Sequence, residues 1–351
     1  MEGRNYVAEL TRLFEEDPEM YVTAAWTLRI VMCRDEIGMV YLEEEGEAFV
    51  LADHKLGICM TKVPAIHGQS KHAFFEAAKA KDHDDTILAT TRAMLLVCAD
   101  FYTAWNARKS LITSGRLRAE DEIKFTSLVL TQHAKSIDTW AHRRWVVQRF
   151  LPQVDDRALP CPCTETHVCM FTGAAFLADE LTLCAKLCEQ YPRNYFAWSY
   201  RFFVGRLLAP PALAIELDAN RAWCTQHVSD HSAWSYRLRL LPLSHVSLLH
   251  DELPFVARLL DLYPDREALW CHRRGVLQAI AADAPPPSSP FDGVDGPASP
   301  VSRIAERLSL DALVHHELHF AGAFDTHYAL RYMVFCLELV LSPSVLELIS
   351  A

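Results

Sequence analysis

The sequence predicts an all-α protein, an α-solenoid of stacked helical hairpins. Two observations favour this class. Glycine is scarce, with 12 among 351 residues, against an average usage of about 7%. The tight turns of many-stranded β folds and the glycine-rich loops of dinucleotide folds are therefore disfavoured. In addition, a tryptophan motif recurs along the chain at a nearly constant spacing, which is typical of repeat architectures.

The motif is a tryptophan followed three residues later by an arginine. Six of the eight tryptophans show it, but Trp26 with Arg29 lies 79 residues before Trp105, out of phase, so five are assigned to the repeat; a weaker sixth copy pairs Tyr328 with Arg331. Successive copies are 35, 58, 36, 36 and 58 residues apart. Both long gaps equal 36 plus 22 residues, so we infer two insertions in one array. The five strong copies are Trp105 with Arg108, Trp140 with Arg143, Trp198 with Arg201, Trp234 with Arg237 and Trp270 with Arg273.

Each period contains two stretches with the apolar pattern of a helix, the second of which carries the motif. Helix pairs of this length stack into an α-solenoid. Ser114 and Gly115 mark one helix end, and later second helices are expected to end near Pro210 and Pro242, because proline lacks an amide hydrogen. The clearest helices are expected over 84–98, 102–113, 120–132, 137–150 and 195–208.

The motif places an indole and a guanidinium on one face of each second helix, since residues three apart lie on the same face. The indole can fill the seam between neighbouring hairpins. The arginine can bond backbone carbonyls or an acid of the adjacent hairpin. These ten residues are therefore interpreted as a structural motif. Tetratricopeptide repeats have a similar period, but their tryptophan is followed by Leu-Gly and a tyrosine, a pattern that is absent here.

The repeat divides the chain into an N-terminal region over 1–83, expected to be partly irregular, and a helical-repeat domain over 84–340. The first insertion, about 151–172, is rich in cysteine and is a weak candidate zinc site. Its Cys-x-Cys spacing is unusual for zinc, so a solvent loop with incidental thiols is the alternative. The second insertion, about 284–300, is rich in proline and is expected to be a linker. The candidate zinc ligands are Cys161, Cys163, His167 and Cys169.

Charge and hydropathy exclude other classes. A net charge of −11 argues against a nucleic-acid-binding protein. No apolar run is long enough to span a membrane, and the first residues do not resemble a signal peptide. Eleven scattered cysteines do not resemble a disulfide framework, so a reduced, cytoplasmic protein is expected.

Three segments resemble the repeats of protein prenyltransferase α-subunits: KSIDTWAHRRW over 135–145, RNYFAWSYR over 193–201 and LWCHRR over 269–274. Further segments resemble the α-subunits of type III geranylgeranyltransferases in particular, at 35–38, 55–57, 105–109 and 227–231. The resemblance covers roughly 35–340 and is sharpest between 100 and 275.

This resemblance implies a non-autonomous enzyme subunit in a heterodimer. A crescent-shaped α-subunit would wrap around a Rab-type geranylgeranyltransferase β-subunit. That β-subunit would hold zinc and geranylgeranyl diphosphate, with no cofactor bound by this chain. The reaction would transfer a geranylgeranyl group to the C-terminal cysteine of a protein, on a singly prenylated SNARE-type substrate. The alternative is a non-catalytic helical-repeat scaffold that binds another protein.

The resemblance also implies three site residues. Lys135 occupies the family's catalytic lysine position, where an ammonium group stabilises the charge that develops on the leaving diphosphate. Asn194 and Tyr195 match the family's substrate-binding pair, although Asn194 would equally suit a helix N-cap and Tyr195 a packing role. Two positions depart from the family: Ile137 stands where tyrosine is common, and Phe196 where histidine is frequent.

Overall fold

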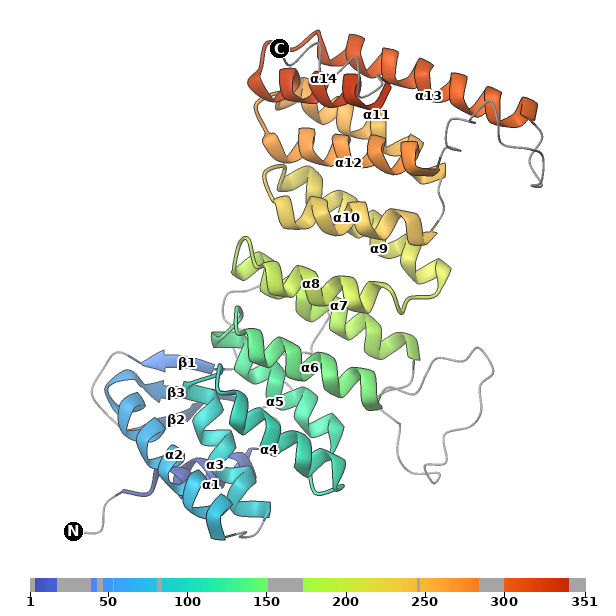
Figure 1. The fold of residues 1–351 in the computed structure, drawn as a ribbon. Coiled ribbons are helices and arrows are strands. Elements are labelled where there is room, and N and C mark those ends of the chain that lie inside the picture. The colour runs from blue at the N-terminus through green and yellow to red at the C-terminus, as the bar shows by residue number, and fades with distance from the viewer. Residues whose placement is uncertain are drawn as a thin grey trace. The chain divides into compact units, whose positions relative to one another are not determined.

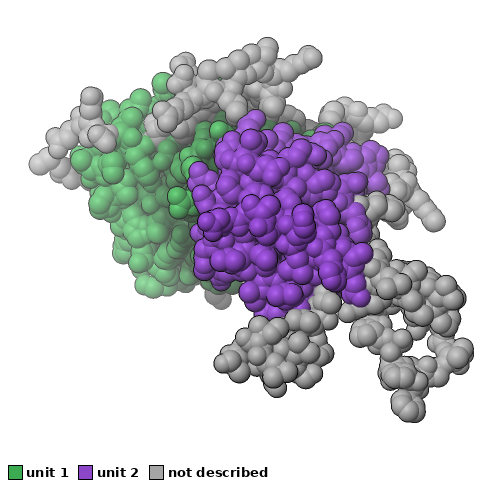
Figure 2. All heavy atoms as spheres, turned by 90° about the horizontal axis from the view of Figure 1, so that it is seen from above, with its two compact units in different colours: residues 1–207 green, residues 208–351 purple. Residues whose placement is uncertain are grey.

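The computed structural model describes residues 4–17, 39–42, 47–52, 54–80, 84–150, 173–244, 247–283 and 300–340. The candidate zinc ligands Cys161, Cys163, His167 and Cys169, and nearly all of the proline-rich insertion, lie outside these residues. The chain divides into two compact units, Met1–Leu207 and Leu208–Ala351, which Figure 2 colours separately.

The first unit begins with a small mixed α/β region. It contains the helix α1 (Tyr6–Glu16), three short strands and the helix α2 (Val63–Ala80), which follows a 3-10 turn at Met60–Lys62. The strands are β1 (Met39–Leu42), β2 (Phe49–Ala52) and β3 (Lys55–Cys59), in the order β1-β3-β2.

The middle strand of this sheet pairs with both neighbours. Gly57 of β3 lies opposite Val40 in the parallel ladder with β1, and opposite Val50 in the antiparallel ladder with β2. The sheet was not predicted, because strands of four or five residues are too short to show a periodicity. It packs on the first helices through one buried cluster that includes Leu10, Met39 and Leu95.

Three helical hairpins complete the first unit (Figure 1). Their helices are α3 (Asp84–Val97) with α4 (Tyr102–Thr113), α5 (Ala119–Gln132) with α6 (Ile137–Phe150), and α7 (Gly173–Gln190) with α8 (Tyr195–Gly205). Two acids open α3, where they favour the positive end of the helix dipole. Gly115, whose φ is +75°, adopts the left-handed conformation just after α4.

The second unit consists of three more hairpins (Figure 1). They are α9 (Pro210–Gln226) with α10 (His231–Ser244), α11 (Ser247–Leu262) with α12 (Glu267–Asp283), and α13 (Pro300–Ala321) with α14 (His327–Val340). Pro210 begins α9, where its missing amide hydrogen costs nothing. Helix α10 runs two residues beyond Pro242, because a proline in the last turn removes one bond without preventing the turn.

The prediction of an α-solenoid is confirmed: each motif tryptophan lies on the second helix of a hairpin, and three such hairpins follow one another along the chain within each unit. In the part of the chain that the structure describes, no helix has both the length and the hydropathy needed to cross a bilayer.

Candidate functional site

Lys135 lies in the turn between α5 and α6, at the start of a motif-bearing helix. The residue is exposed and forms no hydrogen bond or ion pair with any residue that the structure describes. A free ammonium group on an ordered turn is available to an anionic ligand. The catalytic role of Lys135 stays a prediction.

Two buried side chains hold this turn at one atom, the carbonyl oxygen of Ala134. The indole nitrogen of Trp140 donates to it at 2.8 Å, and Nδ2 of Asn194 donates to it at 2.8 Å. The two donors come from different hairpins, so the residue before Lys135 is fixed to both. The position of Lys135 is thus determined by its own hairpin and by the next one.

Asn194 also caps α8, since its Oδ1 accepts a hydrogen bond from the backbone nitrogen of Ala197 at 3.2 Å. Its side chain has no solvent exposure, and both of its polar atoms have protein partners. These two bonds favour a role for Asn194 as the N-cap of α8 and as a support of the lysine turn. They disfavour direct contact between Asn194 and a substrate.

Tyr195, in contrast, is 64% exposed at the first position of α8. The equivalent residues of the two preceding second helices are Tyr102, at 64% exposure, and Ile137, at 60%. All three stand three residues before a motif tryptophan. A row of large exposed apolar side chains at equivalent positions is typical of a surface that another protein covers. We call these three residues the apolar row.

Sequence reasoning missed Arg193, the residue between Pro192 and the cap of α8. It is exposed and adopts a left-handed conformation, with φ of +60°. For a residue other than glycine this conformation costs about 1–2 kcal/mol, so the turn must be held by its neighbours. Since Asn194 is bonded to Ala134, the two cations Lys135 and Arg193 each lie one residue from that bond. A basic residue in the turn before the motif was the available signal.

The motif tryptophans close their turns in the same way in both units. In four of the five, the indole nitrogen donates to the carbonyl six residues earlier, at distances of 2.7–3.0 Å. The bond pins the start of the second helix to the turn that precedes it. The pairs are Trp105 with Ala99, Trp140 with Ala134, Trp234 with Val228, and Trp270 with Pro264.

Four of the motif arginines join their hairpin to the next one in the same unit. Each of four buried guanidinium groups makes a two-pronged ion pair with a glutamate on the first helix of the following hairpin, with shortest distances of 2.5–2.6 Å. In three of them Nη1 also donates to a carbonyl 20 residues earlier, at 2.7–2.9 Å. The pairs are Arg108 with Glu122, Arg143 with Glu180, Arg237 with Glu252, and Arg273 with Glu317.

A third group completes each of these joints. A histidine or tyrosine of the following hairpin bonds the same carboxylate, and its ring packs on the tryptophan of the preceding hairpin. His142, for example, bonds Glu122 at 2.6 Å and lies 4.4 Å from Trp105, measured between ring centroids. The corresponding residues elsewhere are Tyr200 on Glu180, His272 on Glu252 and Tyr332 on Glu317.

These carboxylates are strongly held in their charged form. Burial raises the pKa of Glu122, but the Arg108 guanidinium and His142 outweigh it and lower this pKa from 4.5 to about 2. The pKa of Glu252 is also about 2, because His272 and Arg237 outweigh its burial. The glutamates were missed by sequence reasoning, although a glutamate recurs 18 residues before four of the motif tryptophans, at 122, 180, 216 and 252.

The weak sixth copy, Tyr328 with Arg331, does not occupy the structural position of the other five. Arg331 is exposed rather than buried in a joint, and Tyr332 rather than Tyr328 bonds the glutamate. The reason is the spacing: 15 residues separate Glu317 from Tyr332, whereas 20 separate Glu122 from His142. The last hairpin therefore meets its neighbour in a different register.

The described residues contain no group of three or more histidine, cysteine or acidic side chains that could hold a metal ion. The cysteine-rich loop lies outside those residues, so the zinc site there stays a prediction.

The hairpins are similar in sequence to a known repeat family and to several known proteins. The protein prenyltransferase alpha subunit repeat matches residues 119–150, 177–207, 213–243 and 249–280. The chain is 31% identical over 318 residues to protein prenyltransferase alpha subunit repeat-containing protein 1 of Danio rerio, covering 77% of this chain and 71% of that protein. The Homo sapiens protein of the same name is 30% identical over 324 residues, covering 77% and 76%.

A more distant similarity extends to a named enzyme subunit. Geranylgeranyl transferase type-2 subunit alpha of Sus scrofa is 28% identical over 181 residues, which cover 48% of this chain and 27% of that protein.

Proposed function

The chain belongs to the protein prenyltransferase alpha-subunit repeat family, and from this membership we propose that it is the α-subunit of a heterodimeric, type III-like protein geranylgeranyltransferase. Its partner would be a Rab-type β-subunit. The substrate would be the C-terminal cysteine of a singly prenylated, SNARE-type protein. The observation that carries the proposal is Lys135, an exposed, unpaired cation at the family's lysine position, on a turn fixed by two buried donors.

The reaction explains why a cation is needed there. The sulfur of the substrate cysteine attacks C1 of the isoprenoid, the bond from C1 to the diphosphate oxygen breaks, and the pair of electrons stays on the diphosphate. Negative charge grows on the leaving oxygens, so an ammonium group held beside them stabilises the transition state more than the ground state. Zinc bound by the β-subunit would supply the substrate sulfur as a thiolate.

The remaining site residues would support this step differently. Asn194 would fix the lysine turn rather than touch the diphosphate, because its polar atoms are already bonded. Tyr195 and Arg193 are exposed beside that turn and could donate to diphosphate oxygens. Ile137 offers no hydroxyl where relatives commonly have tyrosine, so a larger share of the charge stabilisation would fall on Lys135.

The apolar row supports the proposed heterodimer. Tyr102, Ile137 and Tyr195 would bury their side chains against the β-subunit, which would bring Lys135 to the rim of the partner's active site. The similarity to a type-2 geranylgeranyl transferase α-subunit favours a Rab-type β-subunit over a farnesyl-type one.

The alternative is a scaffold without a catalytic role, and Ile137 favours it because this departure removes a polar group from the expected site. The two are separated by co-expressing the full chain with a Rab-type β-subunit. We expect a stable complex that transfers geranylgeranyl from its diphosphate to a singly prenylated peptide with a free C-terminal cysteine. If no complex forms, the proposal fails. If a complex forms without transfer to any prenyl-acceptor peptide, the scaffold is favoured.

Lys135→Ala tests the catalytic assignment. We expect kcat to fall about 100-fold, as for loss of one preorganised group facing a developing oxyanion, while the complex still forms. Lys135→Arg should restore part of the rate. The matched control is Lys124→Ala, which removes a lysine from α5 of the same hairpin, away from the turn. Unchanged turnover in Lys135→Ala would remove this residue from the site.

A further inference from the structure

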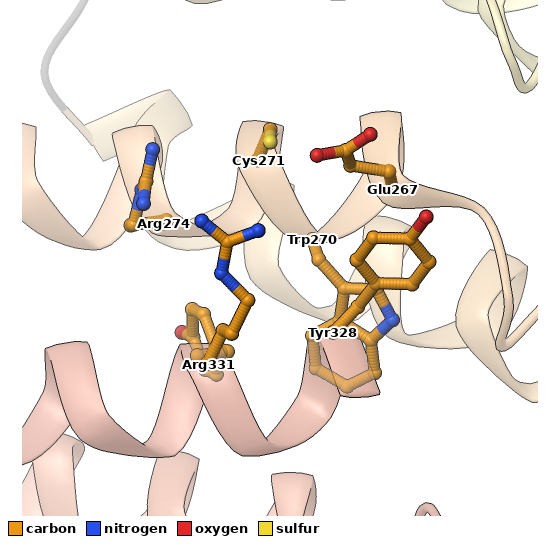
Figure 3. A pocket seen from close by; sticks show the side chains of 7 residues that line it. Glu267, Trp270, Cys271, Arg274, Tyr328 and Arg331 are labelled. Atoms are coloured by element: carbon orange, nitrogen blue, oxygen red, sulfur yellow. The ribbon is translucent and has the colours of Figure 1, made fainter. Parts of the chain in front are cut away.

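The second unit contains a surface pocket between α12 and α14. Cys271 and Arg274 of α12 and Tyr328 and Arg331 of α14 line it, over a wall formed by the indole of Trp270. Figure 3 shows Arg274 and Cys271 on one helix, with Arg331 extending from the neighbouring helix towards them.

The two arginines differ from the motif arginines in having no acidic partner among the described residues. Arg274 lies 5.8 Å from the ring centroid of Phe335, and neither it nor Arg331 makes an ion pair or hydrogen bond with any residue in the described ranges. Arg144, which occupies the position of Arg274 in an earlier hairpin, instead donates to the carbonyl of Ser199 at 3.1 Å. No residue in the part of the chain that the structure describes thus occupies the donors of Arg274 and Arg331.

The surroundings bring both positive charges to one point. Burial raises the pKa of the Cys271 thiol, while Arg274 and Arg331 lower it and Glu267 raises it. Both guanidinium groups and the Glu267 carboxylate thus lie close to the Cys271 thiol and line the same pocket. Trp270 is almost fully buried and makes one wall of this volume apolar.

The charge balance selects the ligand. Two arginines and one glutamate leave a net charge of +1 on the exposed lining, which matches a monoanionic carboxylate better than a dianionic phosphate. Guanidinium groups bind carboxylates through paired N–H donors. Glu267 would accept a hydrogen bond from an amide N–H next to that carboxylate. Both features suit an acidic side chain carried by a peptide backbone.

We propose that the α12–α14 pocket is a docking site for an acidic side chain of a partner protein, with Arg274 and Arg331 binding its carboxylate. The site is separate from the proposed catalytic role of Lys135, so either proposal can fail without the other.

The exposed thiol of Cys271 provides the assay on the full chain. Its alkylation by iodoacetamide, a neutral reagent, is followed by peptide mass spectrometry, which separates it from the other cysteines. The probe is N-acetyl-aspartate N-methylamide at constant ionic strength, and the asparagine analogue is its control. At twice the dissociation constant, alkylation should slow about threefold, because only the empty pocket reacts. The asparagine analogue should give no protection.

Arg331→Gln should abolish the protection, whereas Arg258→Gln, which removes an exposed charge from α11, should retain it. Rates are compared with and without the probe within each variant, because losing an arginine also changes the thiol itself. The proposal is overturned if the aspartate probe fails to protect Cys271, if the asparagine analogue protects equally, or if protection survives Arg331→Gln. It is also overturned if inorganic phosphate protects at lower concentration than the carboxylate.

Discussion

Replacing Glu122 by glutamine should destabilise the first unit strongly, although the two side chains have nearly the same shape. Glu122 is fully buried and accepts hydrogen bonds from Arg108, on the preceding hairpin, and from His142, on the second helix of its own hairpin. A glutamine keeps one acceptor oxygen but turns an NH2 group toward one of these donors. Arg108 is then left as a buried cation without a counter-charge.

Two arguments give the same magnitude. A carboxyl pKa that falls from 4.5 to about 2 corresponds to roughly 3 kcal/mol of interaction with the charged form. Removing one partner of a buried ion pair costs about 3–5 kcal/mol in other proteins. We therefore expect the free energy of unfolding to fall by about 3 kcal/mol, and Tm by about 6–12 °C for a unit of this size.

The assay is urea and thermal unfolding of the full chain followed by circular dichroism. The matched control is Asp121→Asn, which removes the same charge from an exposed position on the same helix and should change stability by less than about 0.5 kcal/mol. A double-mutant cycle with Arg108→Gln should show coupling between the two sites. A loss below about 1 kcal/mol in Glu122→Gln would refute the reasoning that this charge pair holds the joint.

Two further predictions concern pH and the lysine turn. Glu122 and Glu252 have folded pKa values of about 2 against 4.5 in the unfolded chain, so their contribution to stability is complete above pH 4.5 and is lost as the pH falls towards about 2. Burial lowers the pKa of His142 below 6.5, so the unfolded chain takes up a proton first and stability should begin to decline below pH 6.5. A urea midpoint that stays constant from pH 6.5 down to 4.5 and below would contradict both effects. Asn194→Ala should cost about 1–2 kcal/mol through loss of the cap, and Asn194→Asp should restore the cap but not the bond to Ala134. If Asn194→Asp transfers prenyl groups as fast as the unaltered complex, the bond to Ala134 does not position Lys135.

The helices of the repeat could be predicted because their signals are local. Acidic starts, proline and glycine ends and an apolar stripe each act within a few residues, and the boundaries of α4 and α6 coincide with those expected from the sequence. The Trp-x-x-Arg spacing likewise predicted a joint between hairpins, and the motif arginines lie in such joints. The glutamates of these joints were not predicted, although they recur at a constant distance from the motif tryptophans.

The candidate site was harder to predict because its geometry depends on distant residues. The bond from Asn194 to Ala134 spans 60 residues and a 22-residue insertion, so no local pattern indicates it. The sheet near the N-terminus depends on pairing between short strands, which tertiary packing decides. The last hairpin shifts register because a shorter connection separates Glu317 from its tyrosine. The resemblance to the family could predict Lys135 as a site residue, but the hydrogen bonds that hold its turn appear only in the folded structure.

The joints also have a direction, which limits how this chain can be cut. In every described joint the arginine belongs to the earlier hairpin and the glutamate to the later one. A fragment that stops after α4 would keep Arg108 and lose Glu122, while a fragment that starts at α5 would keep Glu122 and lose Arg108. Proteolysis between hairpins thus creates one unmatched buried charge on each side of the cut. Premature termination or cleavage within a unit should therefore yield insoluble or rapidly degraded pieces rather than shorter, working arrays.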